Sequence, residues 1–101
     1  KEAIERIIDT GYKTLDLITF FTTARKELKA WTLKRGEKAI KAAGKIHSDM
    51  ERGFIRAEVI HYNDLVNAGS EQKARELGCY HLQGKDYEIQ DGDIVYFRFK
   101  V

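Results

Sequence analysis

The chain has 101 residues, which is enough for one compact domain and too few for a second catalytic one. Hydrophobic residues make up 43% and charged residues 34%, so the chain has enough apolar material to fold. The net charge of +2 is far from that of a histone-like binder. The single cysteine, Cys79, excludes an internal disulfide and suits a reducing, cytoplasmic environment. The apolar stretches fall short of the roughly 20 residues of a membrane span, so we expect no membrane partner.

Apolar residues at helical spacing open the chain and alternate with charged ones. They predict an amphipathic helix over about residues 1–16. Its apolar stripe needs a covering surface and is therefore a candidate docking face. The stripe consists of Ile4, Ile7, Ile8 and Tyr12.

β-branched and aromatic residues predict two strands next, at Leu17–Thr22 and Leu28–Leu33. A charged turn near Ala24–Lys26 joins them, so we expect a hairpin. Residues 37–46 then follow helical spacing, with a lysine ridge opposite the apolar face. The ridge consists of Lys38, Lys41 and Lys45.

A third strand is predicted at residues 54–60, where Ile55, Ala57 and Val59 alternate with Arg56 and Glu58. This alternation predicts one buried face and one solvated face.

Two short helices are expected at Tyr62–Val66 and Ser70–Leu77, the second with Ser70 as its N-cap. Asp91–Asp93 is a tight-turn signal, followed by an alternating strand that ends at Val101. We expect Tyr87–Gln90 to pair with that strand across the turn. The order of elements favours an α+β fold, a mixed sheet crossed by one main helix.

The sequence offers no catalytic or metal motif. Gly44–Ile46 lacks both the earlier glycine and the hydroxyl residue of a phosphate-binding loop, and Gly44 is better interpreted as a helix C-cap. The spacing of the possible metal ligands does not preorganise a site, so we expect neither a metal ion nor a catalytic residue. These ligands are His47, His61, Cys79 and His81.

The basic segment between Arg25 and Lys45 contains eight basic and two acidic residues. Such a segment either contacts nucleic-acid phosphates or forms a solvated face. Trp31 shares a strand face with Lys29 and is either part of the core or a stacking platform for unpaired bases. The candidate nucleic-acid site consists of Arg25, Lys26, Lys29, Trp31, Lys34, Arg35, Lys38, Lys41, Lys45 and His47.

Several runs carry a family resemblance that covers nearly the whole chain. They are Leu17–Thr22, Lys26–Thr32, Ala42–Ile60, Gly69–Glu71, Gln83–Tyr87 and Asp91–Phe99. In order and spacing they closely resemble the C-terminal TGS domain of the YchF, or Obg-like, ATPases, a family of P-loop NTPases.

The resemblance implies a β-grasp, ubiquitin-like TGS domain over residues 17–101, with residues 1–16 as a connecting helix from the nucleotide-binding part. The parent protein would bind ATP and Mg²⁺ and associate with ribosomes in the cytoplasm. This piece would be a monomeric, non-catalytic module that binds the ribosome or structured RNA. The alternative is a regulatory domain that docks on the parent ATPase core and gates it.

Overall fold

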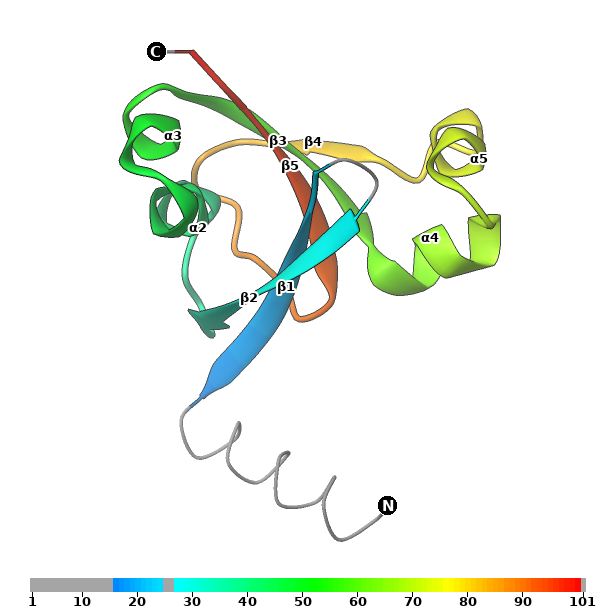
Figure 1. Cartoon of the computed structure of the whole chain (residues 1–101), viewed down its shortest axis with the longest axis horizontal. Coiled ribbons are helices and arrows are strands. Elements are labelled where there is room, and N and C mark those ends of the chain that lie inside the picture. The colour runs from blue at the N-terminus through cyan, green and yellow to red at the C-terminus, as the bar shows by residue number, and fades with distance from the viewer. Residues whose placement is uncertain (1–15, 25–26, 101) are drawn as a thin grey trace, which may run out of the picture.

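A five-stranded mixed sheet forms the centre of the computed structural model, with short helices on both of its faces (Figure 1). The structure describes residues 16–24 and 27–100. The predicted opening helix, with its docking stripe of Ile4, Ile7, Ile8 and Tyr12, lies outside the described residues, as do Arg25 and Lys26 of the first turn. The elements are β1 (Leu17–Ala24), β2 (Glu27–Lys34), α2 (Ala39–Ile46), α3 (Ser48–Arg52), β3 (Phe54–His61), α4 (Tyr62–Ala68), α5 (Glu71–Glu76), β4 (His81–Gln83) and β5 (Asp93–Phe99).

The strand order is β2-β1-β5-β3-β4. The predicted hairpin is confirmed, because β1 and β2 pair antiparallel along their whole length, with Phe20 opposite Trp31. Strand β5 lies in the middle, antiparallel to β3 and parallel to β1. A mixed sheet with a central parallel pair, packed on a helix that follows the first hairpin, is a β-grasp arrangement of the α+β class.

Each face of the sheet has its own core. Helices α2 and α3 cover one face, where Phe20 and Val95 pack with the alanines of α2 (Figure 1). Helices α4 and α5 lie on the other side, where Ile60 and Ile94 pack with Ala74 of α5. The predicted N-cap of α5 is confirmed, since the Ser70 hydroxyl accepts a hydrogen bond from the Lys73 N–H at 3.1 Å.

The prediction of one buried and one solvated face for β3 was wrong in two respects. A register irregularity between Phe54 and Arg56 inserts one residue, so Phe54 packs against the core and Ile55 is 53% exposed. On the other face Glu58 is only 8% exposed, because α5 and β5 supply arginines that cover it.

The prediction that Tyr87–Gln90 pairs with the last strand was also wrong. Both neighbour positions of β5 are taken by β1 and β3, and this segment runs along the start of α2 instead. The Ala39 N–H donates to the Tyr87 carbonyl at 2.7 Å, and the Ile89 N–H donates to the Glu37 carbonyl at 3.1 Å. The segment therefore anchors the N-terminus of the main helix.

Gly44 does not cap its helix, because α2 continues to Ile46 and His47 is the C-cap. A Cβ at Gly44 would lie 2.6 Å from Oε1 of Glu51. The glycine therefore leaves room for the Glu51 side chain of α3 beside α2. Within the part of the chain that the structure describes, no helix has the length and apolar character to cross a membrane.

Candidate nucleic-acid interface

The lysines of α2 lie on its solvent side. Ala39, Ala42 and Ala43 bury the opposite side against the sheet, which leaves Lys41 and Lys45 exposed, as the helical spacing predicts. Lys38 precedes the helix at its N-cap position, and its Nζ lies 3.8 Å from Oδ1 of Asp86. This exposed pair neutralises part of the positive charge at the start of the ridge.

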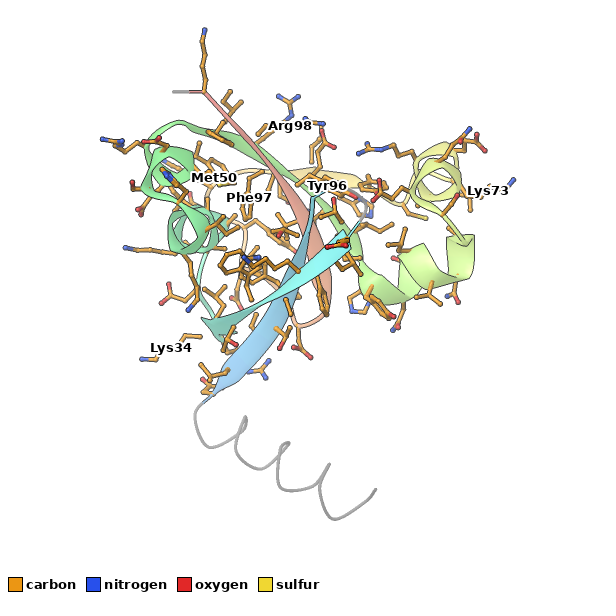
Figure 2. The ribbon with its side chains drawn as sticks, viewed as in Figure 1. Lys34, Met50, Lys73, Tyr96, Phe97 and Arg98 are labelled. Carbon is orange, nitrogen blue, oxygen red and sulfur yellow. The ribbon has the colours of Figure 1, made fainter. Side chains whose placement is uncertain are left out.

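The basic residues of β2 do not all lie together. Successive side chains of a strand point to opposite faces, so Lys29 shares the α2 side of the sheet with Trp31 and Lys34 projects from the other side. In Figure 2, Lys34 lies at the C-terminal end of β2. Arg35 donates from Nε to Oδ1 of Asp16 at 3.1 Å. The structure thus separates Lys34 and Arg35 from Lys29 and Trp31.

Trp31 belongs partly to the core and partly to the surface. It is half-buried and packs against the cluster that contains Phe20. Its Nε1–H donates to Oγ1 of Thr22 at 2.9 Å, which sets the orientation of the ring. Nζ of Lys29 lies 4.6 Å from the ring centroid, in cation–π geometry. The two interpretations of Trp31 are therefore compatible.

A pocket of about 340 Å³ opens beside Trp31. The hairpin, the helix pair and β5 line it with Thr22, Thr23, Lys29, Trp31, Ile46, Met50 and Val95–Arg98. Figure 2 shows Met50 and Phe97 on the side of the sheet that α2 and α3 cover. Sequence reasoning missed the contributions of Ile46, Met50 and β5, because a pocket between distant segments leaves no periodic signal in any one of them.

Strands β1 and β5 both contribute to the pocket. Their register contains one Cα pair, Phe21 with Ile94. The residues that follow on both strands, Thr22 and Thr23 on β1 and Val95–Arg98 on β5, line the pocket. Because successive side chains of a strand point to opposite faces, the side chains of Thr22, Val95 and Phe97 are the ones that share the α2 side with Trp31.

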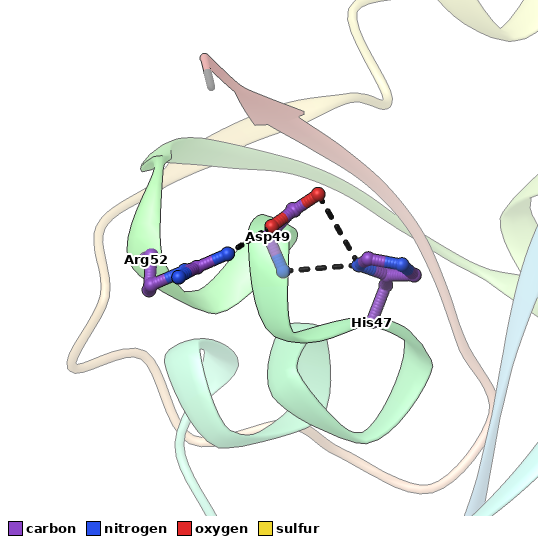
Figure 3. A network of polar contacts seen from close by, with 3 residues as sticks. All are labelled: His47, Asp49 and Arg52. Carbon is purple, nitrogen blue, oxygen red and sulfur yellow. Dashed lines mark hydrogen bonds and ion pairs between the residues drawn. The ribbon is translucent and has the colours of Figure 1, made fainter.

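His47 has a structural role that the sequence analysis missed. It lies between α2 and α3, and its Nδ1 accepts a hydrogen bond from the Asp49 N–H at 3.0 Å (Figure 3). Asp49 also contacts Arg52 one turn further on. His61 caps α4 in the same way, through the N–H of Asn63. Histidine is uncommon at the N-cap position, so residue preference does not indicate this role. The one available signal was the position of each histidine, directly before a helix and two residues ahead of the N–H that it accepts.

The second sheet face carries a buried carboxylate between two arginines. Oε1 of Glu58 lies 3.3 Å from Arg75 on α5, and Oε2 lies 3.1 Å from Nε of Arg98 on β5. The hydrogen bond from Arg98 and its positive charge lower the pKa of Glu58 more than burial raises it. The Arg75 guanidinium also stacks 4.2 Å from the Tyr80 ring. This network joins α5 to the sheet.

A second buried polar pair joins Tyr87 to Asp93. The Tyr87 hydroxyl donates to the buried Asp93 carboxylate at 2.6 Å, and burial together with that carboxylate raises the pKa of Tyr87. A phenol held protonated in this way positions the loop before β5. Over residues 16–24 and 27–100, no three histidine, cysteine or acidic side chains are grouped to hold a metal ion.

The fold makes this chain a β-grasp domain of the α+β class whose surface combines exposed lysines with an aromatic pocket. Residues 17–100 match the family model YchF-GTPase_C, described as "Protein of unknown function (DUF933)". The chain therefore belongs to this family of YchF C-terminal domains.

Individual relatives agree with this assignment. The chain is 52% identical over 98 residues to the ribosome-binding ATPase YchF of Buchnera aphidicola subsp. Schizaphis graminum, an alignment that covers 97% of this chain and 27% of that protein. It is 48% identical over 101 residues to the ribosome-binding ATPase YchF of Bacillus subtilis, covering 100% of this chain and 28% of that protein. The chain thus spans about a quarter of the length of these relatives.

A solved structure shares the fold as well. The structure of the YchF GTPase of Schizosaccharomyces pombe superposes with a TM-score of 0.85 at 42% identity. The match covers 92% of this chain and 25% of that one.

Proposed function

We propose that this chain is a non-catalytic module that binds RNA or the ribosome within a ribosome-associated P-loop ATPase. The observation that carries the proposal is the half-buried ring of Trp31, which lies beside the Lys29 ammonium at a pocket that also reaches Ile46, the last residue of the lysine-bearing helix α2. Cations for phosphates and an aromatic ring for bases are the two components of single-strand recognition.

The lysines supply the sequence-independent part of such binding. Lys41 and Lys45 are exposed and Lys29 lies at the pocket, so each can neutralise a phosphate and release a counterion. Lys38 can contribute once its exposed pair with Asp86 opens. His47 is exposed beside the end of α2 and lies at the margin of this surface.

The names of the relatives agree with a ribosomal partner, since two of them are ribosome-binding ATPases. In the proposal, ATP and Mg²⁺ belong to the nucleotide-binding part of the longer protein, because the phosphate-loop pattern is missing from this sequence. The module itself acts as a cytoplasmic monomer and contributes binding, while turnover takes place elsewhere.

The test is a salt-dependent binding measurement on the 101-residue chain with fluorescently labelled single-stranded RNA. We expect log K to fall with log salt by about 0.7 for each phosphate contacted. The double variant Lys38→Glu with Lys41→Glu should bind more weakly to every RNA sequence and show a smaller salt slope.

The matched control is Lys73→Glu with Lys100→Glu, which makes the same change in net charge on α5 and after β5. Loss of affinity in the first variant alone supports the α2 surface. Equal affinities in the wild type and both variants would contradict it and favour the docking of this module on the parent ATPase core.

A further inference from the structure

We propose that the pocket beside Trp31 holds one unpaired nucleobase of a single-stranded RNA segment, with the adjoining phosphate on Lys29. The inference rests on the proposed function and names the chemical group that the site would recognise. It follows from the shape of the pocket, the position of the ring and the polar groups around it.

The size of the pocket suits one flat ring. Its volume of about 340 Å³ is at the lower end of the range of about 300–1,000 Å³ for small-ligand pockets. Trp31 lies on one side, and Met50 and Phe97 contribute apolar surface. A duplex cannot enter such a pocket, whereas an extruded base can, because only an unpaired base has both of its faces available.

The indole ring is held in position for stacking. Its hydrogen bond to Thr22 fixes the ring, so little conformational freedom is lost when a base stacks on it. The Lys29 ammonium now lies over the ring, on a flexible four-carbon stem. A base that takes this place releases the ammonium to the neighbouring phosphate. Lys29 thereby covers the ring in the free protein and binds the phosphate in the complex.

Thr22 provides a polar group for the edge of the base. Its Oγ1 accepts the hydrogen bond from Trp31, and its own O–H remains a donor at the pocket. A base edge can hydrogen-bond to this hydroxyl, whereas an apolar peptide side chain cannot.

The charge of the pocket also favours a nucleotide. Among the described residues that line it none is acidic, and Lys29 supplies the positive charge, because the Arg98 guanidinium bonds to Glu58 on the other sheet face. A cationic ligand would be repelled, and an anionic aromatic ligand would be attracted.

Trp31 is the only tryptophan in the sequence, so its fluorescence reports on this pocket alone. The 101-residue chain is titrated with an oligouridylate and with an abasic oligonucleotide that has the same number of phosphates. Affinity is followed by a label on the oligonucleotide and the pocket by indole emission. We expect oligouridylate to quench Trp31 and to bind roughly tenfold more tightly than the abasic strand, which should leave the emission nearly unchanged.

Variants sharpen the result. Trp31→Leu should lose roughly tenfold in affinity for oligouridylate and nothing for the abasic strand, and Trp31→Phe should retain part of the difference. Equal affinities and unchanged emission for both strands in the wild type would overturn the base pocket and leave the RNA-binding proposal intact. If neither strand bound at low salt, the proposed function itself would fail.

Discussion

The side chain of Trp31 is tied to the neighbouring strand by a hydrogen bond of 2.9 Å from its Nε1–H to Oγ1 of Thr22. Thr22 stands opposite Lys29 in the hairpin, so this bond places the ring and the ammonium side by side. A surface tryptophan without such a bond would sample several rotamers. The bond therefore contributes to the stability of the hairpin and also sets the position of the ring at the pocket.

Replacing Thr22 by valine should release the indole. The variant Thr22→Val keeps the shape and β-propensity of the side chain and removes the acceptor, so we expect a loss of about 1 kcal/mol in the free energy of unfolding. Urea unfolding followed by Trp31 emission measures it. Thr32→Val, on an exposed residue of the same hairpin, is the control and should change stability by less than about 0.5 kcal/mol. Equal effects in both variants would show that the hydrogen bond contributes nothing.

Removing the charge of Glu58 should loosen the attachment of α5. In Glu58→Gln both arginines lose a charged acceptor, and since they are about half exposed we expect a cost of roughly 1–3 kcal/mol at neutral pH. Glu76→Gln, on an exposed residue of α5, is the matched control.

The same residue predicts a pH dependence. The pKa of Glu58 is lower in the folded state than its usual 4.5, so its contribution is fully present above 4.5 and is lost as the pH falls through the lowered folded value. The difference in unfolding free energy between wild type and Glu58→Gln should therefore shrink below about pH 4. A difference that stays constant down to pH 3 or so would show that the carboxylate is not paired in solution.

Gly53 should tolerate no side chain. A Cβ there would overlap the carbonyl oxygen of Lys100, whose N–H donates to the Gly53 carbonyl at 2.9 Å. Since the obstacle is backbone, we expect Gly53→Ala to cost about 1–3 kcal/mol and to weaken the pairing of the ends of β3 and β5. Gly84→Ala is the control, because a Cβ at Gly84 meets open space. The measurement is the thermal unfolding midpoint of each variant. Equal midpoints would contradict the close approach of Gly53 to the Lys100 carbonyl.

Two lysines of one strand should differ in their effect on RNA binding. Lys29 lies at the pocket and Lys34 on the opposite sheet face, so Lys29→Gln should reduce the salt slope by about 0.7 and Lys34→Gln should leave it unchanged. The measurement is the affinity for labelled single-stranded RNA at several salt concentrations. Equal slopes for the two variants would place the bound strand elsewhere.

Local pattern was sufficient to predict much of this domain. The β-branched run at Leu17–Thr22 and its partner strand form the predicted hairpin, and Ser70 caps the helix it was expected to cap. The lysine ridge of α2 follows from helical spacing alone. In each case the determining interactions lie within a few residues along the chain.

The tertiary structure decided the features that depend on contacts between distant segments. The inserted residue at Ile55 changes which side chains of β3 face each core, and Glu58 is buried by arginines 17 and 40 residues away in the sequence. The pocket beside Trp31 exists because the hairpin, β5 and the helices α2 and α3 meet around it. Sequence periodicity specifies which face of an element is apolar, whereas the packing partner and the spaces that remain are set by how the elements meet.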